Sequence, residues 1–136
     1  MNWNEEVDID VLKGKTLKAI VRDGDRSITF VVDDGTRYRM FHDQDCCESV
    51  LIDDVVGDLQ DLVGEPIFMA EQVSSDDRGS LKGKEHADSY TWTFYKLATR
   101  KGFVDIRWYG ESNGYYSESV EIEKEAQDGQ SETEAE

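Results

Sequence analysis

The chain has 136 residues, which is enough for one domain of ordinary size but not for two. Acidic residues outnumber basic ones by 31 to 15, so the formal net charge is −16 at pH 7. A field of this sign repels phosphate groups, which argues against direct nucleic-acid binding and against docking on an anionic membrane. No apolar run approaches the roughly 20 residues of a membrane span, and no signal-peptide pattern is present. We therefore expect a cytoplasmic domain.

Part of the acidity is concentrated at the carboxyl end. Residues 124–136 contain five acids and one lysine, a net of −4, so residues 1–123 carry the other −12 of the total −16. The end segment has no aromatic or branched aliphatic residue and cannot bury enough apolar surface to offset its ordering entropy. We predict a single β-rich domain over residues 1–123 and a disordered acidic tail over residues 124–136.

Along most of the chain, apolar and polar residues alternate with a period of two, the pattern of half-buried antiparallel strands. Turn-forming residues separate these stretches, and Asp34-Gly35 is a strong hairpin signal because it tolerates the positive φ of a type I′ turn. We predict about eight short strands, over Thr16–Arg22, Ser27–Val32, Thr36–His42, Ser49–Val55, Ile67–Val73, Tyr90–Tyr95, Phe103–Tyr109 and Tyr116–Glu123.

Two short segments are predicted to be helical, Asn4–Leu12 at the amino end and the turn Gly57–Leu62. The polar segment Ser74–Ala87 is predicted to be an exposed loop. Because short strands predominate and no long helical pattern occurs, we expect a mainly β fold, an antiparallel barrel or sandwich with one or two short helical segments.

One segment, Phe41–Glu48, contains a histidine, three acids and two cysteines, which are the common metal-ligand types. A metal site or a thiol enzyme on His42, Asp45 and Cys46 would need a turn, because an extended strand holds His42 about 13 Å from Cys46. The alternative is that Cys46 and Cys47 pack as small apolar side chains while the acids cap a turn. Adjacent cysteines on a strand point to opposite faces. We therefore expect reduced thiols here, with no metal and no cofactor.

A second segment, Arg107–Glu118, combines aromatic residues, an arginine, glycines and small polar residues around a strand–loop–strand turn. Alternation places Arg107 and Tyr109 on the face opposite Trp108. Such a mixture can stack a planar ligand and pair an anionic group with the arginine, and it also fits a protein–protein interface. The alternative is a hairpin whose aromatic side chains are cross-strand core pairs, which we expect for Trp108.

The two segments together form the candidate ligand or partner surface. If they converge on one cleft, a small ligand or catalysis is favoured; if they lie apart and flat, a partner surface is favoured. The candidate residues are His42, Gln44, Asp45, Glu48, Arg107, Tyr109, Ser112, Asn113 and Tyr115.

Three runs of sequence resemble one family of small domains of unknown function, found in bacteriophages and in bacterial genomes as prophage cargo. The resemblance extends from around Leu12 to Ile122 and implies no established reaction. It does imply a phage accessory protein that acts inside the bacterial cell. The runs are FHDQDCCESV at Phe41–Val50, GDLQDLVGEPI at Gly57–Ile67 and TWTFYKLATRKGFVDIRWYGESNGYYSE at Thr91–Glu118.

The leading hypothesis is a non-enzymatic binding protein that recognises a host protein or a small ligand. Its most concrete form is an acidic inhibitor of a host nucleic-acid-binding or defence protein, based on the −12 of the domain and on the resemblance. The alternatives are a metal- or thiol-dependent enzyme centred on His42–Glu48 and a protein that binds a nucleotide-like molecule through the tyrosine- and arginine-containing loop. The sequence leaves the partner and the oligomeric state open.

Overall fold

The computed structural model describes residues 5–44, 47–76, 89–112 and 118–125. Within these ranges the chain forms nine strands and two short 3-10 helices. The strands are β1 (Glu5–Glu6), β2 (Leu17–Asp23), β3 (Ser27–Val32), β4 (Arg37–Phe41), β5 (Ser49–Val56), β6 (Met69–Asp76), β7 (Ser89–Thr99), β8 (Gly102–Ser112) and β9 (Glu121–Lys124). The helices are η1 (Ile9–Leu12) and η2 (Leu59–Leu62).

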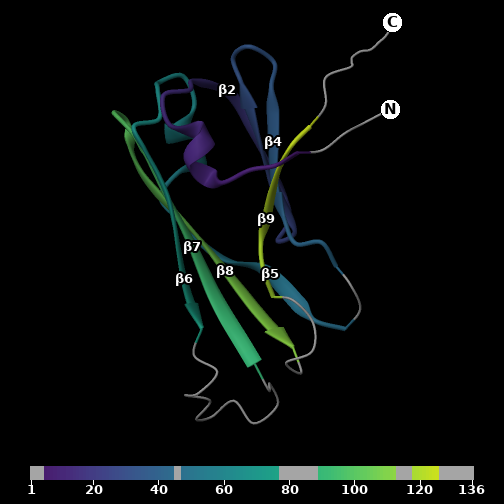
Figure 1. Cartoon of the computed structure of the whole chain (residues 1–136). Coiled ribbons are helices and arrows are strands. Elements are labelled where there is room, and N and C mark those ends of the chain that lie inside the picture. The colour runs from purple at the N-terminus through teal and green to yellow at the C-terminus, as the bar shows by residue number, and fades with distance from the viewer. Residues whose placement is uncertain (1–4, 45–46, 77–88, 113–117, 126–136) are drawn as a thin grey trace, which may run out of the picture.

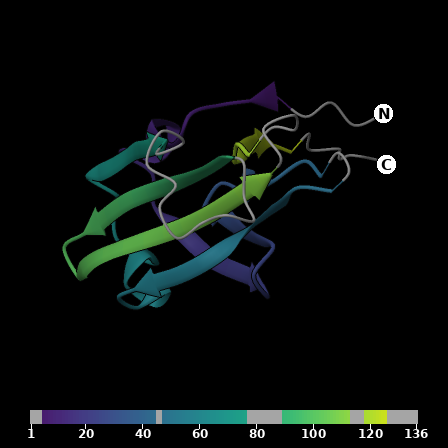
Figure 2. The same cartoon turned by 90° about the horizontal axis from the view of Figure 1, so that it is seen from below.

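The strands form two antiparallel sheets. One sheet has five strands in the order β1-β9-β4-β3-β2, and the other has four in the order β5-β8-β7-β6. The two sheets form separate layers (Figure 1), and the view from below shows β7, β8 and β5 side by side with β2 and β3 behind them (Figure 2). The prediction of a mainly β antiparallel fold is confirmed, and of the two expected architectures the protein adopts the sandwich.

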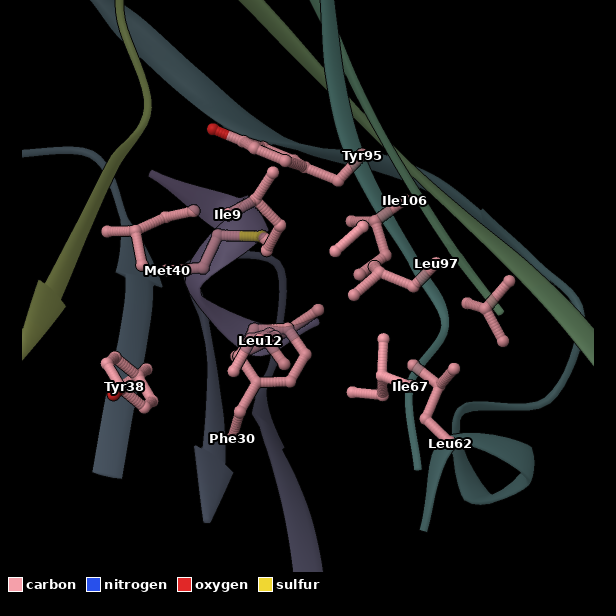
Figure 3. Close-up of a cluster of buried hydrophobic side chains, with 14 of the residues drawn as sticks. Ile9, Leu12, Phe30, Tyr38, Met40, Leu62, Ile67, Tyr95, Leu97 and Ile106 are labelled. Carbon is pink, nitrogen blue, oxygen red and sulfur yellow. The ribbon is translucent and has the colours of Figure 1, made fainter. Parts of the chain in front are cut away.

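The core lies between the two sheets (Figure 3). Alternate residues of each strand point inward, so β3 buries every second side chain and so does β8. Ile9 and Leu12 of η1 and Leu62 of η2 add apolar side chains from outside the sheets. Trp108 of β8 is fully buried, as expected, and its indole N–H contacts Sδ of Met40 in the other sheet at 3.2 Å.

The amino end differs from the prediction. The expected helix over Asn4–Leu12 is wrong for most of its length, because Glu5–Glu6 forms β1 against β9 and only Ile9–Leu12 makes a 3-10 turn. The physical reason is pairing with an available strand edge: the N–H of Val7 donates to the carbonyl of Ile122 at 2.8 Å. Backbone pairing with β9 therefore replaces the local helical hydrogen bonds.

Several element boundaries also shift, and those of β6 and β9 bear on the predicted loop and tail. β6 continues to Asp76, so the first residues of the loop predicted over Ser74–Ala87 belong to a strand, and residues 77–88 lie outside the described ranges. β9 begins at Glu121 and includes Lys124, one residue into the predicted tail. The N–H of Glu125 still donates to the carbonyl of Arg37 at 2.9 Å, and residues 126–136 lie outside the described part.

None of the described helices is long and apolar enough to cross a membrane.

Candidate functional site

The two segments singled out by their chemistry meet at one end of the sandwich. The first segment leads directly into β5, whose first residue, Ser49, pairs with Glu111 near the end of β8. The chain then returns past the same place just before β9. The returning residues Glu118 and Ser119 accept hydrogen bonds from Ser112 and His42 and so connect the two segments.

His42 and Glu48 form a buried pair. Nε2 of His42 lies 2.6 Å from Oε2 of Glu48, and the two side chains are only 3% and 0% exposed. Nδ1 of His42 lies 2.7 Å from the carbonyl oxygen of Ser119, which can only accept, so Nδ1 carries a proton. Both ring nitrogens are therefore engaged, and in this arrangement His42 has no lone pair to direct at a metal ion.

Glu118 anchors the returning segment on the four-stranded sheet. Its Oε1 accepts a hydrogen bond from the hydroxyl of Thr91 at 2.7 Å, and its Oε2 accepts one from the hydroxyl of Ser112 at 2.6 Å. Gly110 makes this approach possible, because a Cβ at that position would lie 3.0 Å from both Cβ and the carbonyl oxygen of Glu118. Since Ser119 is held by His42, the returning segment is bonded to both predicted segments.

These buried groups, which we call the polar cluster (His42, Glu48, Ser112 and Glu118), are hydrogen-bonded in two pairs, and Ser119 and Thr91 supply further partners. The hydroxyl of Ser112 donates to the carboxylate of Glu118 and not to the imidazole of His42. A serine nucleophile activated by histidine needs a hydrogen bond from the serine to the imidazole, and Ser112 does not make that bond in this arrangement. Among the described residues, no group of three or more His, Cys, Asp or Glu side chains is placed to hold a metal ion. The polar cluster therefore fits a role in fixing the fold.

The thiol expectation needs a correction. Cys47 is disulfide-bonded, so the prediction of reduced thiols is wrong for this residue. The prediction relied on strand geometry, but β4 ends at Phe41 and β5 begins at Ser49, so Cys47 lies in the connection between them. The alternation of side chains across a strand does not apply to such a connection. The bonding partner of Cys47 lies outside the described residues.

Arg107 and Tyr109 lie on the outer face of the four-stranded sheet, opposite the core-facing Trp108. Nη2 and Nε of Arg107 lie 2.6 Å and 2.8 Å from Oδ2 of Asp53, and the guanidinium carbon lies 5.3 Å from the centre of the Trp92 ring. The Tyr109 ring centre is 4.6 Å from that of Trp92 in a tilted arrangement, and its hydroxyl contacts Oε1 of Glu111 at 2.9 Å. Aromatic, guanidinium and carboxylate groups thus adjoin on an accessible face.

Strand register extends this arrangement into an outer face, which we define by two adjacent cross-strand rows. Both rows contain large apolar side chains, the second also contains the charged pair Asp54–Arg107, and Val73 at its end is 46% exposed. The rows are Leu51–Tyr109–Trp92 and Asp54–Arg107–Phe94–Val73. Trp92, Phe94 and Tyr109 are each only partly covered. Farther along the same face, Val56 and Phe103 are 59% and 67% exposed.

The structure divides the predicted site residues into two groups. Of those described, His42, Glu48 and Ser112 belong to the polar cluster, and Gln44 donates to the carbonyl of Glu48 at 2.6 Å from an exposed position. Arg107 and Tyr109 belong to the outer face. The remaining predicted residues lie outside the described ranges; they are Asp45, Cys46, Asn113 and Tyr115.

Sequence reasoning missed Trp92, Phe94 and Val73 as surface residues. The stretch from Tyr90 to Leu97 has apolar or aromatic residues on both faces of the strand, so alternation alone does not tell which face is buried. The signal that could have identified this face is the aromatic character of Trp92 and Phe94, because large aromatic side chains are frequent in interfaces.

No curated protein and no solved structure is detectably similar to the chain. A family model does match it, over residues 10–122, which include the polar cluster and the outer face. The chain therefore belongs to the family described as a domain of unknown function, DUF7448.

Proposed function

We propose that the protein is a non-enzymatic binding protein and that its outer face contacts a partner protein. The observation that carries the proposal is the half-buried group of side chains on the outer face in which Trp92 and Tyr109 adjoin Arg107. Tryptophan, tyrosine and arginine are the residue types that most often dominate binding energy at interfaces. A contiguous apolar patch on a sheet face that carries a solvent-accessible arginine is typical of an interaction site.

The polar cluster supports this assignment by elimination. Its side chains are buried and hydrogen-bonded within the protein, and we infer that they are not offered to an external ligand. The outer face also lacks the geometry for a nucleotide-like ligand between its rings, because Trp92 and Tyr109 already contact each other and Arg107 is bonded to Asp53. A protein surface can cover such a face without entering it.

The charge indicates which kind of partner is favoured. The chain carries −16, and on the outer face Asp53 and Asp54 lie beside Arg107 while Glu111 contacts the hydroxyl of Tyr109. A second copy of the chain would be repelled, whereas a basic protein would be attracted and steered toward the surface. We therefore infer a basic partner, and nucleic-acid-binding proteins are a basic class. That the partner is a host protein of a phage-infected bacterium rests on the family resemblance and on this charge.

The proposal is tested by capture of proteins from a bacterial lysate on the immobilised protein at low and at high salt. The decisive variant is Trp92→Ser, and the matched control is Val21→Ser, which removes a side chain that is 55% exposed on the other sheet. We expect the wild type and the control to retain the same basic protein at low salt, and Trp92→Ser to lose it. Recovery of that protein by Trp92→Ser, or no recovery by the wild type, would contradict the proposal.

A further inference from the structure

The edge strands of the two sheets differ in how they resist pairing with another chain. Natural edge strands are protected by shortness, bulges, lysine, proline or a covering segment. β1 has only two residues, and β2 has an irregular register between Leu17 and Ala19 together with an exposed Lys18. β5 has a similar irregularity between Ile52 and Asp54, and the N–H of Ile52 already donates to the carbonyl of Asp25.

Apart from η1, which packs beside part of the strand, β6 has none of these protections. It is eight residues long, its sequence MAEQVSSD contains no lysine, arginine or proline, and its register with β7 is unbroken. In the part of the chain that the structure describes, β7 is its only strand partner, and β6 lies at the end of the sheet order (Figure 1). Glu71, Gln72, Val73 and Ser74 are all exposed. A long, regular, exposed edge of this kind is a template for a further strand.

A shallow groove of about 550 Å³ runs between β6 and the segment around η1. Ile9 and Ala70, each only 2% exposed, give it an apolar floor. Charged residues line its sides, and the carboxylates among them outnumber the ammonium groups by three to one: Asp8, Asp10 and Glu71 against Lys13. The groove therefore offers room for side chains beside the strand edge and favours positive ones.

We propose that the edge of β6 binds an extended segment of a partner protein that carries lysine or arginine. The segment adds a strand to the four-stranded sheet through backbone hydrogen bonds, and its basic side chains reach the carboxylates of the groove. A second copy of the chain is a poor occupant, because β6 itself contains Glu71 and Asp76 and no base. This site shares only Val73 with the outer face, and it does not use Trp92, Tyr109 or Arg107, so it stands independently of the proposed function.

A synthetic peptide tests this assignment. The probe has blocked ends, the length of β6, and alternating lysine and valine; one control replaces each lysine with glutamate, and another replaces the valines with proline. We expect the lysine peptide to give saturable changes in the amide NMR signals of Glu71–Ser74 and of Asp8–Asp10. Amide hydrogen exchange in β6 should slow by about tenfold at a peptide concentration ten times the Kd. Neither control peptide should do this.

Matched variants distinguish binding by the carboxylates of the groove from attraction by the overall negative charge of the protein. Asp10→Lys should weaken binding of the lysine peptide by roughly twofold to fivefold, as expected for an exposed ion pair. Asp33→Lys, which makes the same change of charge at an exposed site in the turn between β3 and β4, should leave the Kd unchanged. Trp92→Ser should also leave it unchanged, so a failure here is distinct from a failure of the outer-face proposal.

Three results would overturn the assignment. The first is no response in β6 to the lysine peptide, and the second is an equal response to the proline peptide. The third is a concentration-dependent dimer, detected by sedimentation, in which the β6 amides become protected without peptide. That result would show that a second copy of the chain pairs with β6.

Discussion

Nε2 of His42 lies 2.6 Å from Oε2 of Glu48 inside the protein, where the two side chains are 3% and 0% exposed. The same imidazole holds the carbonyl of Ser119 through Nδ1. One buried side chain therefore ties the β4–β5 connection to the segment that leads into β9. The pair was selected from the sequence for its chemistry, yet its contacts indicate a role in stability.

Replacing His42 with alanine should be strongly destabilising. The substitution removes the imidazole from the buried Glu48 carboxylate, and breaking a buried ionisable pair in this way costs about 3–5 kcal/mol. The loss would be measured as a decrease in the free energy of unfolding by urea denaturation, with circular dichroism as the signal.

Glu48→Gln is the matched variant for this pair. The amide of glutamine can donate to Nε2 of a neutral His42 while Nδ1 continues to donate to Ser119, so the cost should be only about 1 kcal/mol. If Glu48→Gln were as destabilising as His42→Ala, the proton arrangement described for the pair would be incorrect.

Ser112→Ala should lower stability through Glu118. The hydroxyl of Ser112 donates to a buried carboxylate at 2.6 Å, and a hydrogen bond to a charged group contributes about 1.5–3 kcal/mol. Ser119→Ala is the control, because that hydroxyl contacts Glu121 at an exposed site and its removal should change stability by less than about 0.5 kcal/mol. Thermal unfolding of both variants distinguishes them, and equal effects would contradict the description of Glu118 as an anchor.

Tyr95→Phe should stabilise the protein. The Tyr95 hydroxyl is buried, and within the described structure it has no hydrogen-bond partner, so its removal should add about 1 kcal/mol at neutral pH. A less stable Tyr95→Phe variant would show that the hydroxyl has a partner.

The same substitution should change the response to alkaline pH. Burial, with smaller contributions from the charges of Glu121 and Asp8, raises the pKa of Tyr95 above its ordinary value of 10.0. The unfolded chain then loses this proton more readily than the folded one, so stability that is present below pH 10 is lost as the pH rises above it. Urea titrations between neutral and alkaline pH should show a shallower loss for Tyr95→Phe. An identical loss in both proteins would contradict this origin.

Sequence patterns located the strands well where one face is clearly apolar. β3 has the predicted bounds, Ser27–Val32, because Ile28, Phe30 and Val32 alternate with smaller or more polar residues. The amino end was predicted wrongly because its pairing partner, β9, is more than a hundred residues away in the chain. Local patterns do not register such a distant partner.

The site was predictable in its residues but not in their roles. Residue type identified His42 and Glu48 as side chains capable of binding a ligand. The acceptor that fixes the His42 ring is the backbone carbonyl of Ser119, and a pattern of side chains does not reveal such an acceptor. Conversely, Trp92 was overlooked because both faces of β7 are apolar and only the packing of the two sheets decides which one is exposed.

In our proposal, binding belongs to the outer face and stability to the polar cluster. Isothermal titration of a purified basic partner, captured as above, with the Trp92→Ser and Ser112→Ala variants separates these two roles. We predict that Trp92→Ser raises the Kd by at least about 30-fold, as for an interface hot spot, with the fold retained. Ser112→Ala should lower stability and leave the Kd within about a factor of two. The reverse pattern, with Ser112→Ala abolishing binding and Trp92→Ser binding like the wild type, would contradict the account.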